Sequence, residues 1–344
     1  MAPSIQNLGW FYKNEGVQQP AMQSLFLTGL TLLGAYIFTI WFISYIRFLL
    51  SLYVLPGTQL RTFGSPSKTW AVITGASDGL GKEYALALSK AGYSTLLISR
   101  TASKLDAVAN EIKQKFNTPT RTLAIDFALN RDDDYARLQD AITGLDISIL
   151  INNVGVSHSI PVPFTETPEA EMETIVMVNC MATLRITRLI APGMVDRKRG
   201  LIITMGSFGG LIPTPLLATY SGSKAFLQQW STALGAELAQ HNITVRLVQS
   251  YMITTAMSKI RVPTVFVPAP RPYVRSVLAS IGRSGGAQGF MYSATPWWGH
   301  AWMQYVTNCF VGGHNWMLLR YNVWLHEGIR KRALKKRAER KKAQ

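Results

Sequence analysis

The sequence predicts an α/β protein with a doubly wound parallel sheet, preceded by an apolar segment and followed by a hydrophobic, basic extension. Three observations support this fold class. Short apolar runs alternate with longer amphipathic segments between residues 70 and 250. Most of these runs are continuously apolar, as expected for strands that helices cover on both faces. A glycine-rich turn lies between the first run and the first amphipathic segment.

The first element in the chain is an uncharged stretch at residues 16–46, which is most apolar over 25–46. Crossing the hydrocarbon core of about 30 Å takes about 20 helical residues. We therefore expect an N-terminal segment at 1–22 and a transmembrane anchor at 23–55. A buried core helix and a cleaved signal peptide are the alternatives. A signal peptide fits poorly, because the run starts late and no basic region precedes it.

The charges around this span favour one orientation. Lys13 and Glu15 precede it, whereas Arg47, Arg61 and Lys68 follow it. Because positive charges favour the cytosolic side of a membrane, the part of the chain after the span is expected to face the cytosol.

A short linker is expected at 56–68, followed by the sheet domain at 69–283. Amphipathic stretches such as 81–92 and 103–116 are expected to be helices that connect the strands. The expected strands lie at residues 70–75, 94–100, 121–127, 147–155, 200–207 and 243–250.

The chain after the last strand has two unusual segments. Residues 262–273 are proline-rich and are expected to be irregular, because proline lacks the N–H that helices and sheets need. Residues 284–319 contain no Lys, Arg, Asp or Glu, and we expect them to lie against the membrane, to re-enter it, or to pack over the active site. Pro296, His300 and His314 argue against a second full span.

The chain ends in a basic tail at 320–344, where ten Lys and Arg face only Glu327 and Glu339. This tail holds about half of the formal net charge of +16. No nucleic-acid-binding motif accompanies it, so anionic lipid headgroups or the phosphates of a ligand are the expected partners and nucleic acid is not. The last four residues, KKAQ, resemble a dilysine retrieval signal, although a solvated basic tail would look the same.

The bulk composition excludes several classes of protein. Of the 344 residues 48% are hydrophobic and 16% charged, which excludes general disorder. Cys180 and Cys309 are far apart in the chain, so neither a disulfide framework nor a metal site is expected.

The glycine-rich turn TGASDGLG spans residues 74–81 between the first strand and the first helix. Glycines permit a tight turn and close approach of the backbone to a pyrophosphate, which then sits on the helix N-terminus. A purely structural turn is the alternative. The residues predicted to contact the dinucleotide here are Gly75, Ser77, Asp78, Gly79, Leu80 and Gly81.

Residues at the ends of the following strands complete the predicted nucleotide site. Arg100 stands where an acidic residue would hold a ribose 2′-hydroxyl, and a guanidinium suits a 2′-phosphate, so NADPH is preferred over NADH. Asp126 is a candidate for the adenine amine or a cap for the next turn. Asn153 and Gly155 end the fourth strand, where Asn152 and Asn153 can brace the sheet.

The candidate chemical site is the sequence YSGSK at residues 220–224. Tyr220 and Lys224 lie four residues apart on one helix face, where the ammonium can lower the pKa of the phenol. Ser207 ends an apolar strand and can hold a carbonyl oxygen, or it caps a turn. Asn179 is polar within an apolar helical stripe and either supports a water next to Lys224 or simply makes buried hydrogen bonds.

Together, the glycine turn, NNVG at 152–155, Asn179, Ser207 and YSGSK resemble the short-chain dehydrogenase/reductase family in identity, order and spacing. The resemblance implies a Rossmann fold, transfer of the pro-S hydride of the nicotinamide, Tyr220 as proton donor, Lys224 as ribose ligand, Ser207 as carbonyl ligand and Asn179 in a proton relay. It also implies cofactor contacts by Ile253 and Thr255, although Ser250-Tyr251 replaces the usual Pro-Gly before them.

The outer segments resemble one branch of this family. The apolar N-terminus, the stretch at 257–278, TPWWGHAW at 295–302 and the basic tail are similar to the very-long-chain 3-oxoacyl-CoA reductases. This resemblance implies reduction of a 3-oxoacyl-CoA in fatty-acid elongation at the endoplasmic reticulum membrane, beside other elongation enzymes. A 17β-hydroxysteroid or retinoid oxidoreductase and a non-catalytic nucleotide-binding scaffold remain the alternatives.

Overall fold

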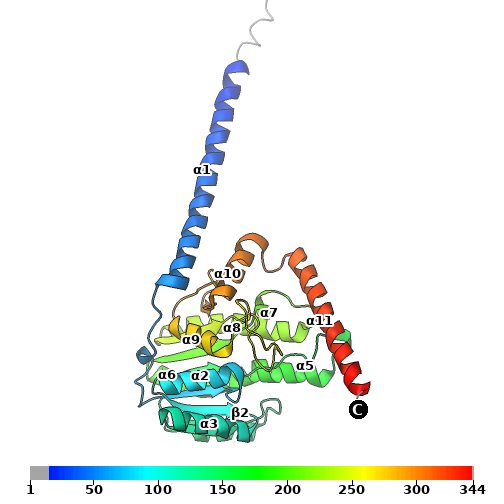
Figure 1. Cartoon of the computed structure of the whole chain (residues 1–344). Coiled ribbons are helices and arrows are strands. Elements are labelled where there is room, and N and C mark those ends of the chain that lie inside the picture. Colours follow the sequence, from blue (N-terminus) through cyan, green and yellow to red (C-terminus); the bar gives the residue numbers. More distant parts are fainter. Residues whose placement is uncertain (1–14, 343–344) are drawn as a thin grey trace, which may run out of the picture. The chain divides into compact units, whose positions relative to one another are not determined.

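The computed structural model describes residues 15–342 and divides into two compact units between Leu50 and Ser51 (Figure 1). Part of the expected N-terminal segment (1–14) and the last two residues of the dilysine-like end lie outside the described residues. The elements in chain order are α1 (Glu15–Leu49), η1 (Leu50–Val54), η2 (Leu60–Thr62), β1 (Trp70–Thr74), α2 (Gly79–Lys90), β2 (Ser94–Ser99), α3 (Ala102–Phe116), β3 (Thr120–Ala124), α4 (Asp132–Ile142), β4 (Ile147–Asn152), η3 (Phe164–Glu166), α5 (Glu169–Val176), η4 (Met177–Met181), α6 (Ala182–Asp196), β5 (Gly200–Met205), α7 (Phe208–Leu211), α8 (Ala218–Ala239), β6 (Ile243–Val248), α9 (Pro270–Ala279), β7 (Ser293–Ala294), α10 (Trp298–Val306), η5 (Thr307–Val311) and α11 (Trp316–Lys342).

The second unit is built on a parallel sheet with the strand order β3-β2-β1-β4-β5-β6-β7. All six strands expected from the sequence are present, and the doubly wound fold is confirmed. The strand order reverses direction between β1 and β4. In such a sheet the connections at the carboxyl ends of these two strands diverge and leave a crevice for a ligand.

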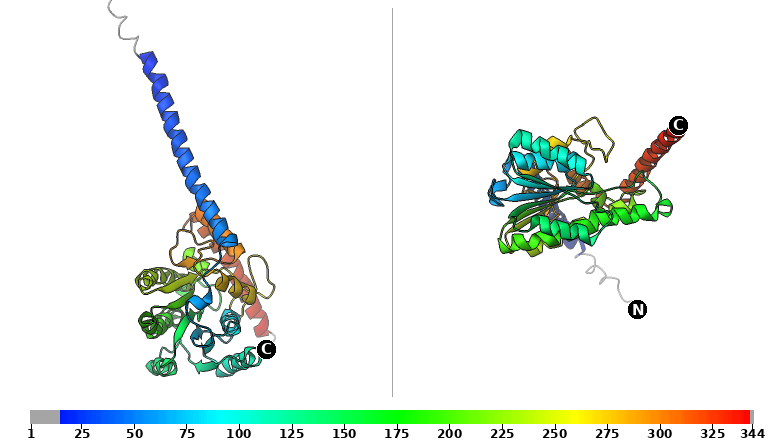
Figure 2. Two further views of the ribbon diagram at one scale, coloured as in Figure 1. Left: turned by 90° about the vertical axis from the view of Figure 1, so that its left-hand side faces the viewer. Right: turned by 90° about the horizontal axis from the view of Figure 1, so that it is seen from below.

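Helices cover both faces of the sheet (Figure 2). On one face, Ile73 of β1 packs in a core cluster with α2, α3 and α9. On the other face, its neighbour Val72 packs with α4, α6 and α8. Adjacent strand residues point to opposite faces, so a strand buried on both sides must be apolar at every position. This explains the continuous apolar runs in the sequence.

The first unit consists of α1. Residues Met22–Val54 are long and apolar enough to cross a membrane, and an 18-residue stretch within them has a mean hydropathy of 1.9 and no buried residue. A helix that is apolar on all sides lacks the polar face of a soluble surface helix, so α1 is compatible with membrane anchoring. Glu169–Asp196 meets the same criteria of length and composition, but it is 56% buried because it packs on the sheet as α5, η4 and α6.

The region after residue 283 differs from expectation. β7 pairs with β6 through Leu247 and Val248, so the sheet extends beyond the expected domain boundary at 283. α10 follows, with His300 fully buried. Residues 284–306 are therefore largely part of the folded unit, as the packing alternative anticipated. The sequence did not reveal β7, because two residues are too few to form a recognisable pattern.

The expectation that all of residues 262–273 would be irregular is also wrong at its C-terminal end. Helix α9 begins at Pro270, so this proline lies in the first turn of the helix. The N–H groups of a first helical turn have no partner within the helix, so a proline there loses no hydrogen bond.

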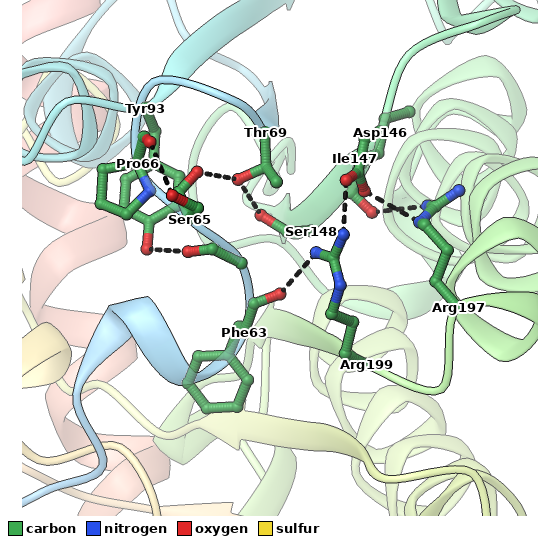
Figure 3. Close-up of polar contacts among 11 residues, drawn as sticks. Phe63, Ser65, Pro66, Thr69, Tyr93, Asp146, Ile147, Ser148, Arg197 and Arg199 are labelled. Atoms are coloured by element: carbon green, nitrogen blue, oxygen red, sulfur yellow. Dashed lines mark hydrogen bonds and ion pairs between the residues drawn. The ribbon is translucent and has the colours of Figure 1, made fainter.

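The expected linker at 56–68 lies within the second unit and is packed there. Phe63 is buried, and its carbonyl oxygen accepts a hydrogen bond of 3.2 Å from Arg199. The hydroxyl of Tyr93 donates to the carbonyl oxygen of Gly64 at 2.9 Å, and Arg199 also pairs with Asp146 (Figure 3). These long-range contacts hold the segment in place where it enters β1.

Candidate active site

The glycine turn connects β1 to α2 at the carboxyl edge of the sheet. Gly75 and Gly79 have φ angles of 65° and 55°, in the left-handed region where glycine carries no steric penalty. Asp78 caps α2, because its carboxylate accepts the N–H of Gly79 at 2.7 Å. The remaining N–H groups of the first turn lack intrahelical partners, so this helix end favours an anion.

The turn is held by close backbone packing. A Cβ atom on Gly81 would lie 2.1 Å from the carbonyl oxygen of Gly75, so this position admits only glycine. The side-chain amide of Asn153 donates to the carbonyl oxygen of Thr74 at 2.9 Å. The hydroxyl of Thr74 in turn accepts the N–H groups of Asn153 and Val154 at 3.0 Å each. Asn153 and the turn therefore form one unit, as the sequence predicted for the end of β4.

The candidate residues that follow β2 and β3 differ in their surroundings. The hydroxyls of Ser77 and Ser99 are 2.8 Å apart. Arg100 follows directly and is exposed. Asp126 accepts the N–H of Ala128 at 3.1 Å, so it caps the turn after β3.

Tyr220, Lys224 and Ser207 come together where β5 and α8 meet. Tyr220 and Lys224 lie on α8, and the ammonium nitrogen is 6.0 Å from the centre of the tyrosine ring. Ser207 follows β5, and its hydroxyl and the Tyr220 ring lie together beside Gly209, where a Cβ would be 3.5 Å and 3.4 Å from them. Its hydroxyl also accepts the N–H of Gly209 at 3.1 Å and caps α7, so the two alternative roles of Ser207 are compatible.

The local environment shifts the pKa values of this group. Burial raises the pKa of Tyr220, while the nearby Ser207 hydroxyl lowers it. Lys224 is only 6% exposed, and burial lowers its pKa to about 8. Its ammonium group donates to the carbonyl oxygen of Met205 at 2.8 Å. An ammonium has three N–H donors, so two are left to point at other acceptors.

Asn179 lies on η4, a wide turn that joins α5 to α6, and it is fully buried. Its side-chain oxygen accepts the N–H of Val156 at 2.8 Å, and its amide donates to the carbonyl oxygen of Val156 and the hydroxyl of Ser223. Gly155 lies beside it, because a Cβ there would be 3.3 Å from the Asn179 oxygen and 3.5 Å from the Lys224 nitrogen. Asn179 thus joins the loop after β4 to α8.

The loop after β6 folds back over the glycine turn. A Cβ on Gly79 would lie 3.3 Å from the methyl group of Thr255. Ile253 is buried, and its carbonyl oxygen accepts the hydroxyl of Ser258 at 2.6 Å. Leu80 packs against the core below. The structure therefore brings this loop next to the turn, as its predicted role requires.

One cluster beside the site was not predicted from the sequence. His300 of α10 lies among the rings of Phe208, Tyr251 and Tyr273 at centroid distances of 5.8–6.2 Å. Its Nδ1 accepts the N–H of Tyr251 at 3.4 Å, and burial lowers its pKa to about 4, so it is neutral at pH 7. The replacement of the usual Pro-Gly by Ser250-Tyr251 draws attention to Tyr251 in the sequence. No pattern in the sequence connects Tyr251 to His300.

Comparison with known proteins identifies the relatives of this chain. The model of the short chain dehydrogenase family matches residues 69–264. The chain is 56% identical over 326 residues to a very-long-chain 3-oxoacyl-CoA reductase of Phaeosphaeria nodorum, covering 93% of this chain and 95% of that protein. It is 58% identical over 312 residues to a protein of the same name from Pyrenophora tritici-repentis, covering 90% and 91%.

Solved structures of similar proteins share the fold. A short-chain dehydrogenase from Sphingobium yanoikuyae in complex with NADPH has a TM-score of 0.58 at 26% identity, covering 66% of this chain and 87% of that one. A metagenomic short-chain oxidoreductase in complex with NADP has a TM-score of 0.55 at 29% identity, covering 67% and 96%.

Proposed function

The chain belongs to the short-chain dehydrogenase family, and we propose that it is an NADPH-dependent reductase of very-long-chain 3-oxoacyl-CoA. The reaction is 3-oxoacyl-CoA plus NADPH and a proton, giving 3-hydroxyacyl-CoA and NADP⁺. The convergence of Ser207, Tyr220 and Lys224 at the sheet edge beside the glycine turn carries this proposal. Relatives that bear this name match more than nine tenths of the chain, including the parts outside the sheet.

The crevice suits a dinucleotide. Gly75 and Gly81 let the turn pack closely on itself and on Asn153, and the start of α2 offers N–H groups to a pyrophosphate. Lys224 has two free donors for ribose hydroxyls next to Gly155. When bound, NADPH supplies the hydride that adds to the carbonyl carbon. We assign the cofactor contacts to the turn residues, Arg100, Asp126, Asn153, Gly155, Ile253 and Thr255.

Arg100 provides the first test of the cofactor assignment. Replacing it with alanine is expected to weaken NADPH binding about 10- to 100-fold, the value of a charge-assisted hydrogen bond, with little change for NADH. Fluorescence titration of the full-length protein with each nucleotide measures both constants. Arg131→Ala, at an exposed position before α4, serves as a control. Equal losses for the two nucleotides would contradict a role for Arg100 at the 2′-phosphate.

Gly81 provides a second test, because its substitution distorts the turn itself. Gly81→Ala places a Cβ 2.1 Å from a backbone oxygen, so the turn must shift and NADPH affinity is expected to fall at least about 100-fold. Gly328→Ala on α11 is a matched control, since its Cβ meets nothing closer than 3.7 Å. Circular dichroism confirms that each variant is folded before titration. An affinity of Gly81→Ala within a few-fold of the wild type would argue against this cradle.

The chemistry at the substrate carbonyl is assigned to side chains of this chain. Ser207 donates a hydrogen bond to the carbonyl oxygen and positions it beside the Tyr220 hydroxyl. Tyr220 then gives its proton to the oxygen as charge develops there. The ammonium of Lys224 stabilises the phenolate that remains. Its own pKa of about 8 keeps it mostly charged at pH 7, so the stabilisation is present at neutral pH.

Asn179 is assigned a positioning and relay role. Its three hydrogen bonds join the loop after β4 to Ser223, which is adjacent to Lys224. We infer that these bonds hold the loop after β4 in a position where a water can contact the Lys224 ammonium. That water can then return a proton to Tyr220. A buried amide with all these partners also has a structural value, so its removal is expected to loosen α5 and α8 together.

Substrate choice is tested by comparing two ketones. The purified full-length protein is expected to oxidise NADPH with a long-chain 3-oxoacyl-CoA far faster than with a 17-ketosteroid. The reverse preference would favour a steroid oxidoreductase. Absence of turnover with either ketone, together with intact NADPH binding, would favour a nucleotide-binding scaffold.

We propose that α1 anchors the protein in the endoplasmic reticulum membrane with the folded unit in the cytosol, beside other enzymes of fatty-acid elongation. Arg47, Arg61 and Lys68 after the span support this orientation. A very long acyl chain partitions into lipid with about 0.8 kcal/mol per CH₂, so a tethered enzyme meets its substrate at the bilayer. Protease protection of microsomes tests the orientation.

A further inference from the structure

The first residues of the folded unit, 51–53, are held against the segment after α9 and against α10. The hydroxyl of Ser51 accepts the N–H of Gly285 at 2.9 Å, and Arg283 donates to the carbonyl oxygen of Ser51 at 3.1 Å. The indole of Trp302 on α10 donates to the hydroxyl of Tyr53 at 2.9 Å. Residue 53 lies at the end of the apolar stretch Met22–Val54, so the last residues of that stretch contact α10.

Exposed apolar side chains continue from α10 onto α11. We define the docking surface as Val306, Trp316, Met317, Tyr321 and Trp324. Trp316 and Trp324 are 66% and 68% exposed, and the ring of Trp324 lies tilted against that of Tyr321 at a centroid distance of 5.9 Å. Large exposed aromatic clusters of this kind mark interaction sites. Tryptophan and tyrosine are the residues enriched at membrane–water interfaces.

The two sides of α11 are chemically different. At 3.6 residues per turn, Trp316, Tyr321 and Trp324 fall within an arc of about 140°, and Lys331 and Lys335 fall within the same arc. Both lysines are exposed. The arc is thus aromatic in the first turns of the helix and basic in the later turns.

The opposite side of α11 binds the folded unit. Asn322 donates to the carbonyl oxygen of Pro213 at 3.1 Å, and Arg330 donates to that of Pro161 at 3.0 Å. Arg330 also pairs with Glu166 at 2.6 Å. Pro213 lies in the loop after α7 and Pro161 in the loop after β4, and both loops reach the candidate active site, where Thr214 lies beside Gly209 and Gly155 lies beside Lys224. The docking surface is therefore fixed to the rim of that site and faces outward.

Charge favours an anionic lipid surface over a second copy of this chain as the occupant of this surface. No Asp or Glu occurs between residues 238 and 326, and nine Lys and Arg follow between 330 and 342 against one Glu. A basic segment beside inserted aromatic rings matches anionic headgroups above an apolar layer. A second copy of this chain would instead bring two strongly basic helices together.

We propose that α11 docks on the surface of the bilayer that α1 crosses, with the docking surface inserted and Lys331 and Lys335 on anionic headgroups. The inference rests on the proposed membrane anchoring. The contact is peripheral, because α10 and η5 together span only 298–311 and α10 buries His300 and Gln304 in the folded unit. It brings the mouth of the candidate active site to the lipid, where an acyl chain is dissolved.

The test places a spin label on Trp324→Cys in the full-length protein, in a Cys309→Ser background that removes the partly exposed native thiol. The protein is reconstituted into phosphatidylcholine vesicles with and without phosphatidylserine. Power saturation should show the label accessible to oxygen and shielded from a nickel chelate in the anionic vesicles. We expect a nickel accessibility about five-fold below that of the control label.

The control label is Leu129→Cys, which is similarly exposed but follows β3 at the opposite edge of the sheet from β7. Lys331→Gln with Lys335→Gln should reduce the shielding at 324 in anionic vesicles only. Equal nickel accessibility at 324 and 129 in floated vesicles would overturn the proposal. Shielding that persists in detergent and falls on dilution would indicate a second copy and also overturn it. Failure to float at all would overturn the anchoring instead.

Discussion

Tyr220→Phe is expected to lower kcat for 3-oxoacyl-CoA reduction at least about 10³-fold while NADPH affinity stays within a few-fold of the wild type. The substitution removes one hydroxyl and keeps the ring. The lost hydroxyl is the proton donor assigned above, and the Lys224 nitrogen lies 6.0 Å from the centre of the same ring. Single-turnover oxidation of bound NADPH measures this loss directly.

The matched control is Tyr135→Phe. Tyr135 is a buried tyrosine on α4 whose hydroxyl has no hydrogen-bond partner, so its removal should leave turnover and stability nearly unchanged. The assignment of the proton donor would be refuted by a Tyr220→Phe variant that retains more than about a tenth of wild-type turnover. Loss of NADPH binding in the same variant would show that the substitution disturbed the crevice rather than the chemistry.

The fold could be predicted largely because its signals are local. The strands β1 to β6 are apolar at nearly every position, and buried parallel strands require this wherever they occur. β7 has only Ser293 and Ala294, and it is held in the sheet by Leu247 and Val248 rather than by its own pattern. Because β7 is a strand only through its pairing with β6, its own two residues carry no pattern that predicts it.

The candidate site could also be predicted where its signals lie within short segments of the chain. The helical spacing of Tyr220 and Lys224, and the conformational freedom of Gly75 and Gly81, are properties of short segments. The contact between Tyr251 and His300 joins residues 49 positions apart, and no local pattern encodes it. Arg330 and its partners Pro161 and Glu166 are even farther apart in the sequence. The packing of α11 beside the candidate site could therefore not be predicted either.

Lys224→Met is expected to be the second most damaging substitution, lowering kcat about 10²- to 10³-fold, because a neutral side chain cannot stabilise the Tyr220 phenolate. The wild-type enzyme should show a related pH dependence. The Lys224 ammonium loses its charge as the pH rises through its pKa of about 8, so kcat of the wild type is expected to fall above that pH. The low kcat of the variant is expected not to change in this range. Stopped-flow turnover from pH 6 to pH 10 measures both profiles.

Unfolding experiments test the same buried charge independently of catalysis. The pKa of Lys224 falls from 10.5 in the unfolded chain to about 8 in the folded one, so between these values the unfolded chain binds the extra proton. Burial of the charge therefore costs stability below pH 8, and this cost disappears as the pH rises. The free energy of unfolding of the wild type, relative to Lys224→Met, should increase by about 2 kcal/mol between pH 7 and pH 10. Every other titrating group is common to both proteins, so a flat difference would mean that Lys224 is not a buried ammonium and could not act on Tyr220 as proposed.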